Sequence, residues 1–287
     1  MSTTENSITV GSWKWFYRQA QPSNESDKLP VILLHGLPAH SFIWREMMPD
    51  LAAAGFCAIA PDWIGSGFSS KPDKRDFSYT PQAYIDALGD FLTALNISKF
   101  HLIVQGFLAS VGLQYALRHP EQIERLVILN TPLSTKAKLP FKMQQWGWLF
   151  AGDMLTQDPL LVDRSLENGS GFVIADQNLA MFRKPFRQSS DVGRALLTTV
   201  KKLNLASSMT ELETGFSQWQ QPTLIVWGMA DPWLAAEDAE NLARNLTNGE
   251  LVKLPEAKHY PQEHWYEEIN QAILPFLRRQ LQVETSN

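Results

Sequence analysis

FHLIVQGFLASVGLQYALRHP, residues 100–120, is the stretch of sequence that indicates the fold. It begins with an apolar run typical of a buried strand, and its second half, from Leu108 to Arg118, has a helical pattern. Only Gln105, Gly106 and Phe107 are left for a sharp turn between the two. In α/β proteins, ligands bind where the strands end, so this turn is expected to face a functional site.

Short apolar runs like this one alternate with amphipathic segments along the chain. The alternating segment SWKWFYR and six further runs are expected to be strands, the six at 31–36, 56–62, 101–106, 125–130, 223–228 and 251–257. Helices are expected at 41–54, 81–95, 108–118, 235–246 and 262–280. Most runs are almost continuously apolar, as parallel strands covered on both faces must be. The pattern predicts a doubly wound α/β sheet.

The alternation stops between residues 133 and 218, where strand-like runs are missing and helical patterns dominate. Another strand-like run follows, so the simplest interpretation is a helical cap inserted into an α/β core. We therefore expect a core formed by residues 1–132 and 219–287, and a cap formed by residues 133–218.

The composition is that of an ordinary globular protein, with 44% hydrophobic and 19% charged residues and a net charge of −5 among 287 residues. Because Lys and Arg form no long run, neither nucleic acid nor an anionic membrane is an expected partner. The single cysteine, Cys57, cannot form an intramolecular disulfide. We find no signal-peptide pattern, and no apolar run approaches the ~18 residues of a membrane span. A cytoplasmic location is expected.

Polar residues and glycines follow the predicted strands at their carboxyl ends. His35-Gly36-Leu37 follows one run and Gln105-Gly106-Phe107 another, while Asp231 and His259 come after the last two runs. Parallel strands end at one edge of a sheet, so these residues are expected to lie near one another. No spacing of His, Cys, Asp and Glu resembles a metal site, and we expect no metal or cofactor.

Several of these motifs together resemble the α/β-hydrolase superfamily, and more closely its haloalkane dehalogenase and epoxide hydrolase branch. The resemblance rests on LLHGLPAHSFIWREMMPDLAAAGFCAIAPDWIGSGFSSKPD (33–73), HLIVQGFLAS (101–110), TLIVWGMADPW (223–233) and LPEAKHYPQEH (254–264). It covers about residues 28–280 and is weak within 133–218. It implies a mostly parallel eight-stranded sheet with an inserted helical cap.

The resemblance also implies roles for individual residues. Asp231 would orient His259, and the carboxylate would leave the second imidazole nitrogen free as a general base. The backbone N–H groups of Leu37 and Phe107 would form an oxyanion hole. Gly106 stands where the superfamily has its nucleophile, so that position is expected to be vacant. Ser110 is the nearest hydroxyl, about one helical turn beyond it, and is the weaker candidate nucleophile.

Two activities of the branch are not expected. Related dehalogenases hold the halide with a polar residue after His-Gly and a Trp after the nucleophile, where this chain has Leu37 and Phe107. Related epoxide hydrolases polarise the epoxide with cap tyrosines, but all six tyrosines here lie outside residues 133–218.

Three hypotheses for the function follow. The first is an enzyme without a covalent intermediate, in which His259 and Asp231 promote water-mediated hydrolysis or lyase-type chemistry on a small apolar molecule. The second is a catalytically inactive protein that binds such a molecule. The third is a serine hydrolase that uses the displaced Ser110. The sequence leaves the ligand, the reaction and the oligomeric state open.

Overall fold

A computed structural model describes residues 2–279 and contains an eight-stranded sheet. The strands are β1 (Thr3–Val10), β2 (Trp13–Ala20), β3 (Val31–Leu34), β4 (Ala58–Pro61), β5 (Phe100–Gln105), β6 (Ile123–Leu129), β7 (Thr223–Gly228) and β8 (Gly249–Leu254). Their order across the sheet is β1-β2-β4-β3-β5-β6-β7-β8. Only β1–β2 and β2–β4 are antiparallel pairs, and the other neighbours are parallel. The predicted α/β-hydrolase fold is confirmed.

The six apolar runs correspond to β3–β8, and SWKWFYR forms most of β2. The central strands are buried along their whole length, β5 included, which explains why they are apolar without alternation. Strand β1 was missing from the expected ranges. It is a sheet edge with an exposed or half-buried, mostly polar sequence, TTENSITV, and therefore lacks an apolar run.

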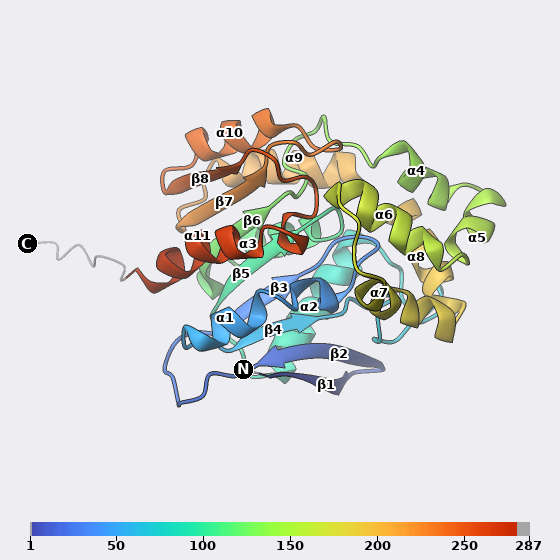
Figure 1. Cartoon of the computed structure of the whole chain (residues 1–287), viewed down its shortest axis with the longest axis horizontal. Coiled ribbons are helices and arrows are strands. Elements are labelled where there is room, and N and C mark those ends of the chain that lie inside the picture. Colours follow the sequence, from blue (N-terminus) through green and yellow to red (C-terminus); the bar gives the residue numbers. More distant parts are fainter. Residues whose placement is uncertain (1, 280–287) are drawn as a thin grey trace, which may run out of the picture.

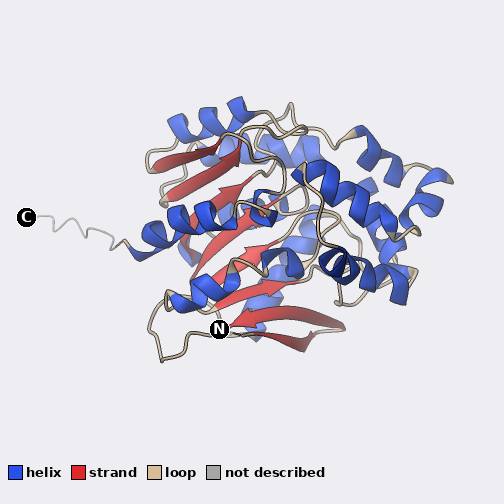
Figure 2. Ribbon diagram, in the orientation of Figure 1, coloured by secondary structure: helices blue, strands red, loops and turns tan. Residues whose placement is uncertain are grey.

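Helices cover both faces of the sheet (Figures 1 and 2). On one face α1 (Met48–Ala53) packs beside α11 (Tyr266–Arg278), and Asn270 of α11 donates to the Asp50 carboxylate at 2.7 Å. On the other face α3 (Ser110–Arg118) packs between α2 (Pro81–Ala94) and α9 (Leu205–Phe216). Helix α10 (Ala236–Asn245) packs on β7 and β8.

Two expected helices are shorter in the structure than in the sequence pattern. The segment 41–54 consists of a 3-10 turn, η1 (Ser41–Trp44), followed by α1. The segment 262–280 consists of η4 (Pro261–Glu263) and α11, and residue 280 lies outside the described residues. Helix α2 begins at Pro81 as expected, with the Thr80 hydroxyl accepting the N–H of Ala83.

The segment between β6 and β7 is helical. It contains α4 (Phe141–Gln144), η3 (Gln145–Gly147), α5 (Ala151–Thr156), α6 (Leu160–Ser170), α7 (Asp176–Gln188), α8 (Asp191–Lys202) and α9. We call α4 to α8 the inserted helices. They lie together at one end of the molecule, whereas α9 packs on α3 (Figure 1). The division into a core and a separate cap domain stays a prediction.

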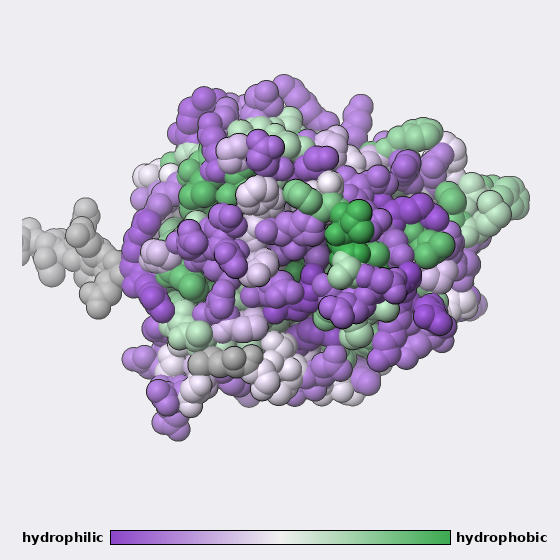
Figure 3. Space-filling view, viewed as in Figure 1, coloured by the Kyte–Doolittle hydropathy of each residue, from purple (hydrophilic) through white to green (hydrophobic). Residues whose placement is uncertain are grey.

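The surface of the inserted helices is unusually apolar. The large hydrophobic side chains recorded as exposed within residues 2–279 all lie between positions 141 and 173, and include Trp148, Leu149, Phe150 and Met154. Figure 3 shows apolar residues gathered at this end of the molecule.

Candidate functional site

The turn after β5 keeps the left-handed backbone expected of a nucleophile elbow. Gly106 has a φ of +85°, and its N–H donates to the Asn130 carbonyl at 3.1 Å. Helix α3 begins four residues later, at Ser110. A residue with a Cβ is disfavoured at such a φ, so glycine relaxes the turn.

The space beside Gly106 is taken by the loop that follows β3. A Cβ built on Gly106 would lie 2.9 Å from the Cα of Gly36, and one built on Gly36 would lie 2.6 Å from the Cα of Gly106. The nearest atoms in both cases belong to the backbone, which cannot rotate away as a long side chain can. Neither position therefore accepts a side chain without a shift of the backbone.

Ser110 makes no hydrogen bond with His259 in the described structure. It is fully buried in the first turn of α3, and its hydroxyl donates to the Phe107 carbonyl at 2.8 Å. Such a local hydrogen bond is common for serine near a helix start. It leaves the hydroxyl proton engaged with the backbone.

Asp231 and His259 come together from two neighbouring strand ends. His259 Nδ1 lies 2.8 Å from Asp231 Oδ2, and both side chains are fully buried. Asp231 lies in the loop after β7 and His259 in the loop after β8, so the parallel pairing of these strands brings the two residues together.

Three further donors hold the Asp231 carboxylate. Asn130 donates its amide to Oδ2 at 2.8 Å, while the N–H groups of Trp233 and Leu234 donate to Oδ1 at 2.8 and 3.2 Å. Asn130 is itself fixed by two hydrogen bonds with the backbone of Gly228. Each carboxylate oxygen thus has two hydrogen-bond partners once His259 is counted, so the buried side chain is fully satisfied.

The backbone on either side of the His259 ring is fixed by two other segments. The His259 N–H donates to the Gly169 carbonyl at 2.8 Å, and the His259 carbonyl accepts the Gln105 side-chain amide at 2.7 Å. Gly169 belongs to α6 and Gln105 is the last residue of β5. The imidazole position therefore depends on the core sheet and on the inserted helices together.

Aromatic rings enclose the imidazole of His259. Phe107 stacks on it with ring centroids 5.2 Å apart, and Trp233 and Tyr260 lie at 4.6 and 4.8 Å. The second nitrogen, Nε2, is buried and has no hydrogen-bond partner among the described residues. A buried polar atom without a hydrogen-bond partner lowers the stability of the fold by on the order of 1–3 kcal/mol. The unpaired Nε2 of His259 therefore needs an explanation.

Leu37 and Phe107, the two oxyanion-hole candidates, directly follow the touching glycines Gly36 and Gly106. Both side chains are buried. The Tyr260 hydroxyl donates to the Leu37 carbonyl at 2.7 Å and holds this loop in place. Burial raises the pKa of Tyr260 well above its ordinary value, so the hydroxyl keeps its proton and stays a donor.

Asp62 and His35 support the loops around this site. The Asp62 carboxylate accepts the N–H groups of Ser41 and Phe68, both at 2.7 Å, and His35 Nε2 contacts the N–H of Trp63 at 3.3 Å. Burial alone would raise the pKa of Asp62, but nearby histidines and these hydrogen bonds hold it below its ordinary value. These contacts give both residues a structural role in holding the loops.

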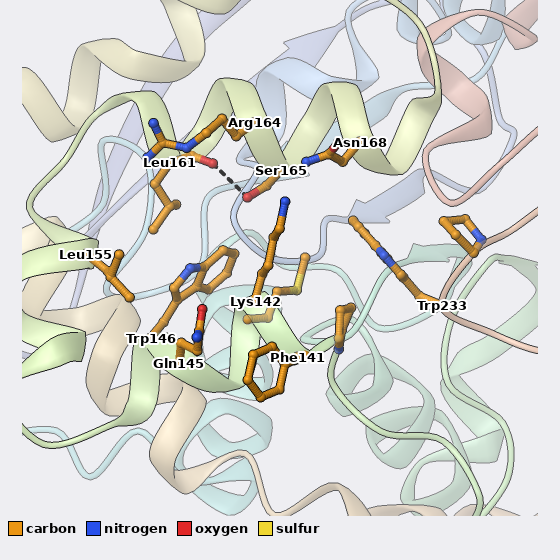
Figure 4. A pocket seen from close by; sticks show the side chains of 13 residues that line it. Phe141, Lys142, Gln145, Trp146, Leu155, Leu161, Arg164, Ser165, Asn168 and Trp233 are labelled. Atoms are coloured by element: carbon orange, nitrogen blue, oxygen red, sulfur yellow. Dashed lines mark hydrogen bonds between the residues drawn. The ribbon is translucent and has the colours of Figure 1, made fainter.

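A cavity of about 740 Å³ lies among the inserted helices (Figure 4). Its lining comes from α4, η3, α5, α6 and the residues Pro232 and Trp233 after β7. Neither Gly106 nor His259 is part of this lining, whereas Trp233 borders the cavity and also contacts His259. Trp233 therefore belongs both to the cavity lining and to the surroundings of the buried imidazole.

Three residues important to this geometry were not singled out from the sequence: Asn130, Trp233 and Tyr260. Asn130 had one usable signal, since it is the first polar residue after the apolar run of β6 and ends at the same sheet edge as Asp231. The contacts of Trp233 and Tyr260 with His259 have no comparable pattern in the sequence.

Within residues 2–279, no three His, Cys, Asp or Glu side chains are grouped so that they could hold a metal ion. In the same range, none of the helices has the length and apolar character needed to cross a membrane.

The relatives found among curated proteins include decarboxylases and haloalkane dehalogenases. The chain is 26% identical over 276 residues to a cis-3-alkyl-4-alkyloxetan-2-one decarboxylase of Xanthomonas campestris, covering 88% of this chain and 90% of the relative. It is 27% identical over 253 residues to a haloalkane dehalogenase of Mycolicibacterium paratuberculosis, covering 86% and 83%. A decarboxylase of the same name from Shewanella oneidensis is 42% identical over 109 residues, which cover only 38% of this chain and 34% of that protein.

Solved structures and the family pattern agree on the fold. The haloalkane dehalogenase DbeA from Bradyrhizobium elkani superposes with a TM-score of 0.85 at 22% identity, over 96% of this chain and 98% of that one. The family pattern described as alpha/beta hydrolase fold matches residues 30–264. That match spans most of the chain and includes both strand ends that carry Asp231 and His259, and it shows that the protein belongs to the alpha/beta hydrolase fold family.

Proposed function

We propose that this protein is an alpha/beta hydrolase-fold enzyme that works without a covalent intermediate, with His259 as its general base. The observation that carries the proposal is the unpartnered Nε2 of His259, buried while Nδ1 is bound by Asp231. Carboxylate binding at Nδ1 favours the tautomer with its proton there and leaves the Nε2 lone pair free to accept one.

The position of Gly106 supports a mechanism without a protein nucleophile. In active members of this fold, the residue at the elbow carries the attacking side chain. Here that residue is Gly106, and the backbone of Gly36 occupies the adjoining space. Water activated by His259 takes the place of the side chain as the attacking group.

The names of the relatives suggest the substrate class. A cis-3-alkyl-4-alkyloxetan-2-one is a four-membered lactone with two alkyl chains, and it is a small apolar molecule with one reactive carbonyl. His259 removes a proton from water as the water oxygen bonds to that carbonyl carbon. The ring bond between this carbon and the ring oxygen then breaks, and the ring oxygen takes the proton from His259. The product is a 3-hydroxy acid.

This reaction requires an oxyanion hole and a route for the substrate to His259. The N–H groups of Leu37 and Phe107 hold the carbonyl oxygen as it gains negative charge. Trp233 must move to admit the substrate, since the imidazole of His259 is fully buried and Trp233 lies against it. Movements of single loops or side chains that admit substrate are common in enzymes.

The experiment is incubation of the purified protein with a cis-3,4-dialkyloxetan-2-one, followed by NMR and mass spectrometry. Hydrolysis gives the 3-hydroxy acid, and in heavy-oxygen water the label enters the product carboxylate and not the protein. A lyase reaction gives an alkene and carbon dioxide instead. His259→Gln is expected to lower the rate by about 10²–10⁴-fold, the usual contribution of a general base.

One control variant makes the outcome specific. Ser110→Ala is expected to keep the wild-type rate, because the Ser110 hydroxyl is bonded to the Phe107 carbonyl. A large loss in this variant would favour the displaced-serine mechanism. Wild-type turnover no faster than buffer, or an equal rate in His259→Gln, would rule out the proposed chemistry.

A catalytically inactive binding protein is the second candidate. The observation in its favour is that the 740 Å³ cavity is lined by the inserted helices and Trp233, and not by the dyad. In that case an apolar ligand binds in the cavity and the lactone is recovered unchanged.

A further inference from the structure

The charged side chains that line the cavity among the inserted helices are all cations. Its lining residues include two cations, Lys142 and Arg164, and no Asp or Glu. The remaining polar members are the neutral side chains of Gln145, Ser165 and Asn168. A cavity with cations and no carboxylates favours an anion over a cation or a zwitterion.

The two cations differ in their partners. Arg164 is bound to Asp158 at 2.6 Å, so most of its charge is already balanced. Lys142 has no ion pair among residues 2–279. Figure 4 shows its side chain extending toward Ser165 and Asn168 of α6 across the cavity. The balance leaves one free positive charge, which matches a monoanion.

The part of the lining that we call the apolar end consists mainly of hydrophobic side chains. Met143, Trp146 and Leu161 are buried, and Leu155 is half-buried beside them. Phe141, which is 64% exposed, lines the same cavity and adds an apolar surface that reaches solvent. An alkyl chain would be desolvated here, and the gain in free energy rises with each buried methylene.

We infer that this cavity binds an alkyl carboxylate, with the carboxylate at Lys142 and the chain against Trp146, Leu155 and Leu161. The Lys142 ammonium and the Asn168 amide supply the donors, because the Ser165 hydroxyl donates to the Leu161 carbonyl at 2.6 Å. A charged donor facing a carboxylate makes one of the stronger hydrogen bonds available in a protein. The volume of about 740 Å³ lies within the usual range for small-molecule sites.

The inference deepens the proposed function, since a 3-hydroxy acid with an alkyl chain is itself an alkyl carboxylate. It rests on that function only for the statement that the bound molecule reaches, or comes from, His259. Binding in the cavity needs neither His259 nor Gly106, because neither lines it. Either the carboxylate site or the proposed catalytic function can therefore be disproved while the other holds.

The test is isothermal titration calorimetry of the full chain with decanoate, and with 1-decanol as a neutral ligand of similar length. Decanoate is expected to bind with an affinity at least about tenfold above that of 1-decanol, as one charge-assisted hydrogen bond provides. Lys142→Met is expected to remove this preference, and Lys142→Arg to keep it. Lys74→Met, which removes the same charge at an exposed position outside the cavity, is the matched control and should bind like wild type.

A second variant tests the position of the chain without touching the charge. Leu155→Trp narrows the apolar end and should weaken decanoate more than hexanoate, while thermal unfolding checks that the protein is still folded. Equal affinity for decanoate and 1-decanol, no binding of either, or equal losses in Lys142→Met and Lys74→Met would overturn the inference.

The same titration with His259→Gln separates this inference from the proposed function. One outcome is that His259→Gln binds decanoate with wild-type affinity while the wild-type protein fails to turn over the lactone. That combination would support the carboxylate site and contradict the catalytic proposal. Loss of decanoate binding in His259→Gln, with the protein folded, would place the ligand at the dyad and overturn the cavity assignment.

Discussion

Gly36 and Gly106 are in backbone contact where β3 and β5 end, and a Cβ on either residue would come within 3.0 Å of the Cα of the other. Neighbouring strands carry these two glycines to one point on the sheet edge. The contact closes the space in which an elbow side chain would begin, so Gly106 is part of the packing of the turn.

The first prediction is that Gly106→Ala destabilises the fold by about 2–3 kcal/mol, measured by urea denaturation. Two effects combine, because the φ of +85° disfavours a Cβ and the added methyl group meets Gly36. Gly11→Ala isolates the first effect, since Gly11 has a φ of +56° and nothing within 4 Å of a built Cβ. Equal losses in both variants would mean that the loop after β3 moves aside freely.

The second prediction concerns Asp231→Asn, which keeps the shape of the side chain and removes its charge. Asn130 and His259 both donate to Oδ2, and the N–H of Trp233 donates to Oδ1. Whichever of the two oxygens is replaced by the NH₂ group of Asn, that NH₂ group then faces hydrogen-bond donors. We expect a loss of about 1–3 kcal/mol in the free energy of unfolding. Asp238→Asn, which affects one hydrogen bond from Ser134 nearer the surface, should cost about 0.5 kcal/mol or less. A similar small loss for Asp231→Asn would mean that the hydrogen bonds to its carboxylate contribute little to the stability of the fold.

The sequence was sufficient to predict seven of the eight strands, all except β1, and the approach of Asp231 to His259. Apolar runs mark the strands that are buried on both faces, and parallel strands end at one edge, so residues after β7 and β8 had to be neighbours. The contact between Gly36 and Gly106, and the position of Trp233 over His259, depend on distances of a few ångströms between separate loops. No residue pattern encodes such distances, and the cavity among the inserted helices depends on them in the same way.

The third prediction is a loss of stability between neutral and mildly acidic pH that depends on His101. Burial, with a smaller contribution from Arg125, lowers the pKa of His101 from 6.5 to about 4. Between these values the unfolded chain takes up a proton that the folded protein excludes, so stability falls as the pH falls from 6.5 toward 4. One histidine contributes about 1.4 kcal/mol per pH unit within this window.

The measurement is the free energy of unfolding in urea across that pH range. His101→Gln should reduce the slope by the contribution of one histidine. Buried His40, whose pKa is also lowered to about 4 by burial, keeps a remaining slope in this variant. An unchanged slope in His101→Gln would mean that His101 gains a proton in the folded protein.

The last prediction is that Trp233→Ala exposes the imidazole of His259 to reagents. Trp233 lies with its ring centroid 4.6 Å from that of His259 and borders the cavity, so removing the indole joins the cavity to the imidazole. Modification of His259 by diethyl pyrocarbonate, mapped by peptide mass spectrometry, should become several-fold faster than in the wild type. Trp148→Ala removes an exposed indole from the inserted helices without touching this boundary and should leave the rate unchanged. Equal rates at His259 in the wild type and in Trp233→Ala, with the variant folded, would mean that reagents reach the imidazole by a route that Trp233 does not block.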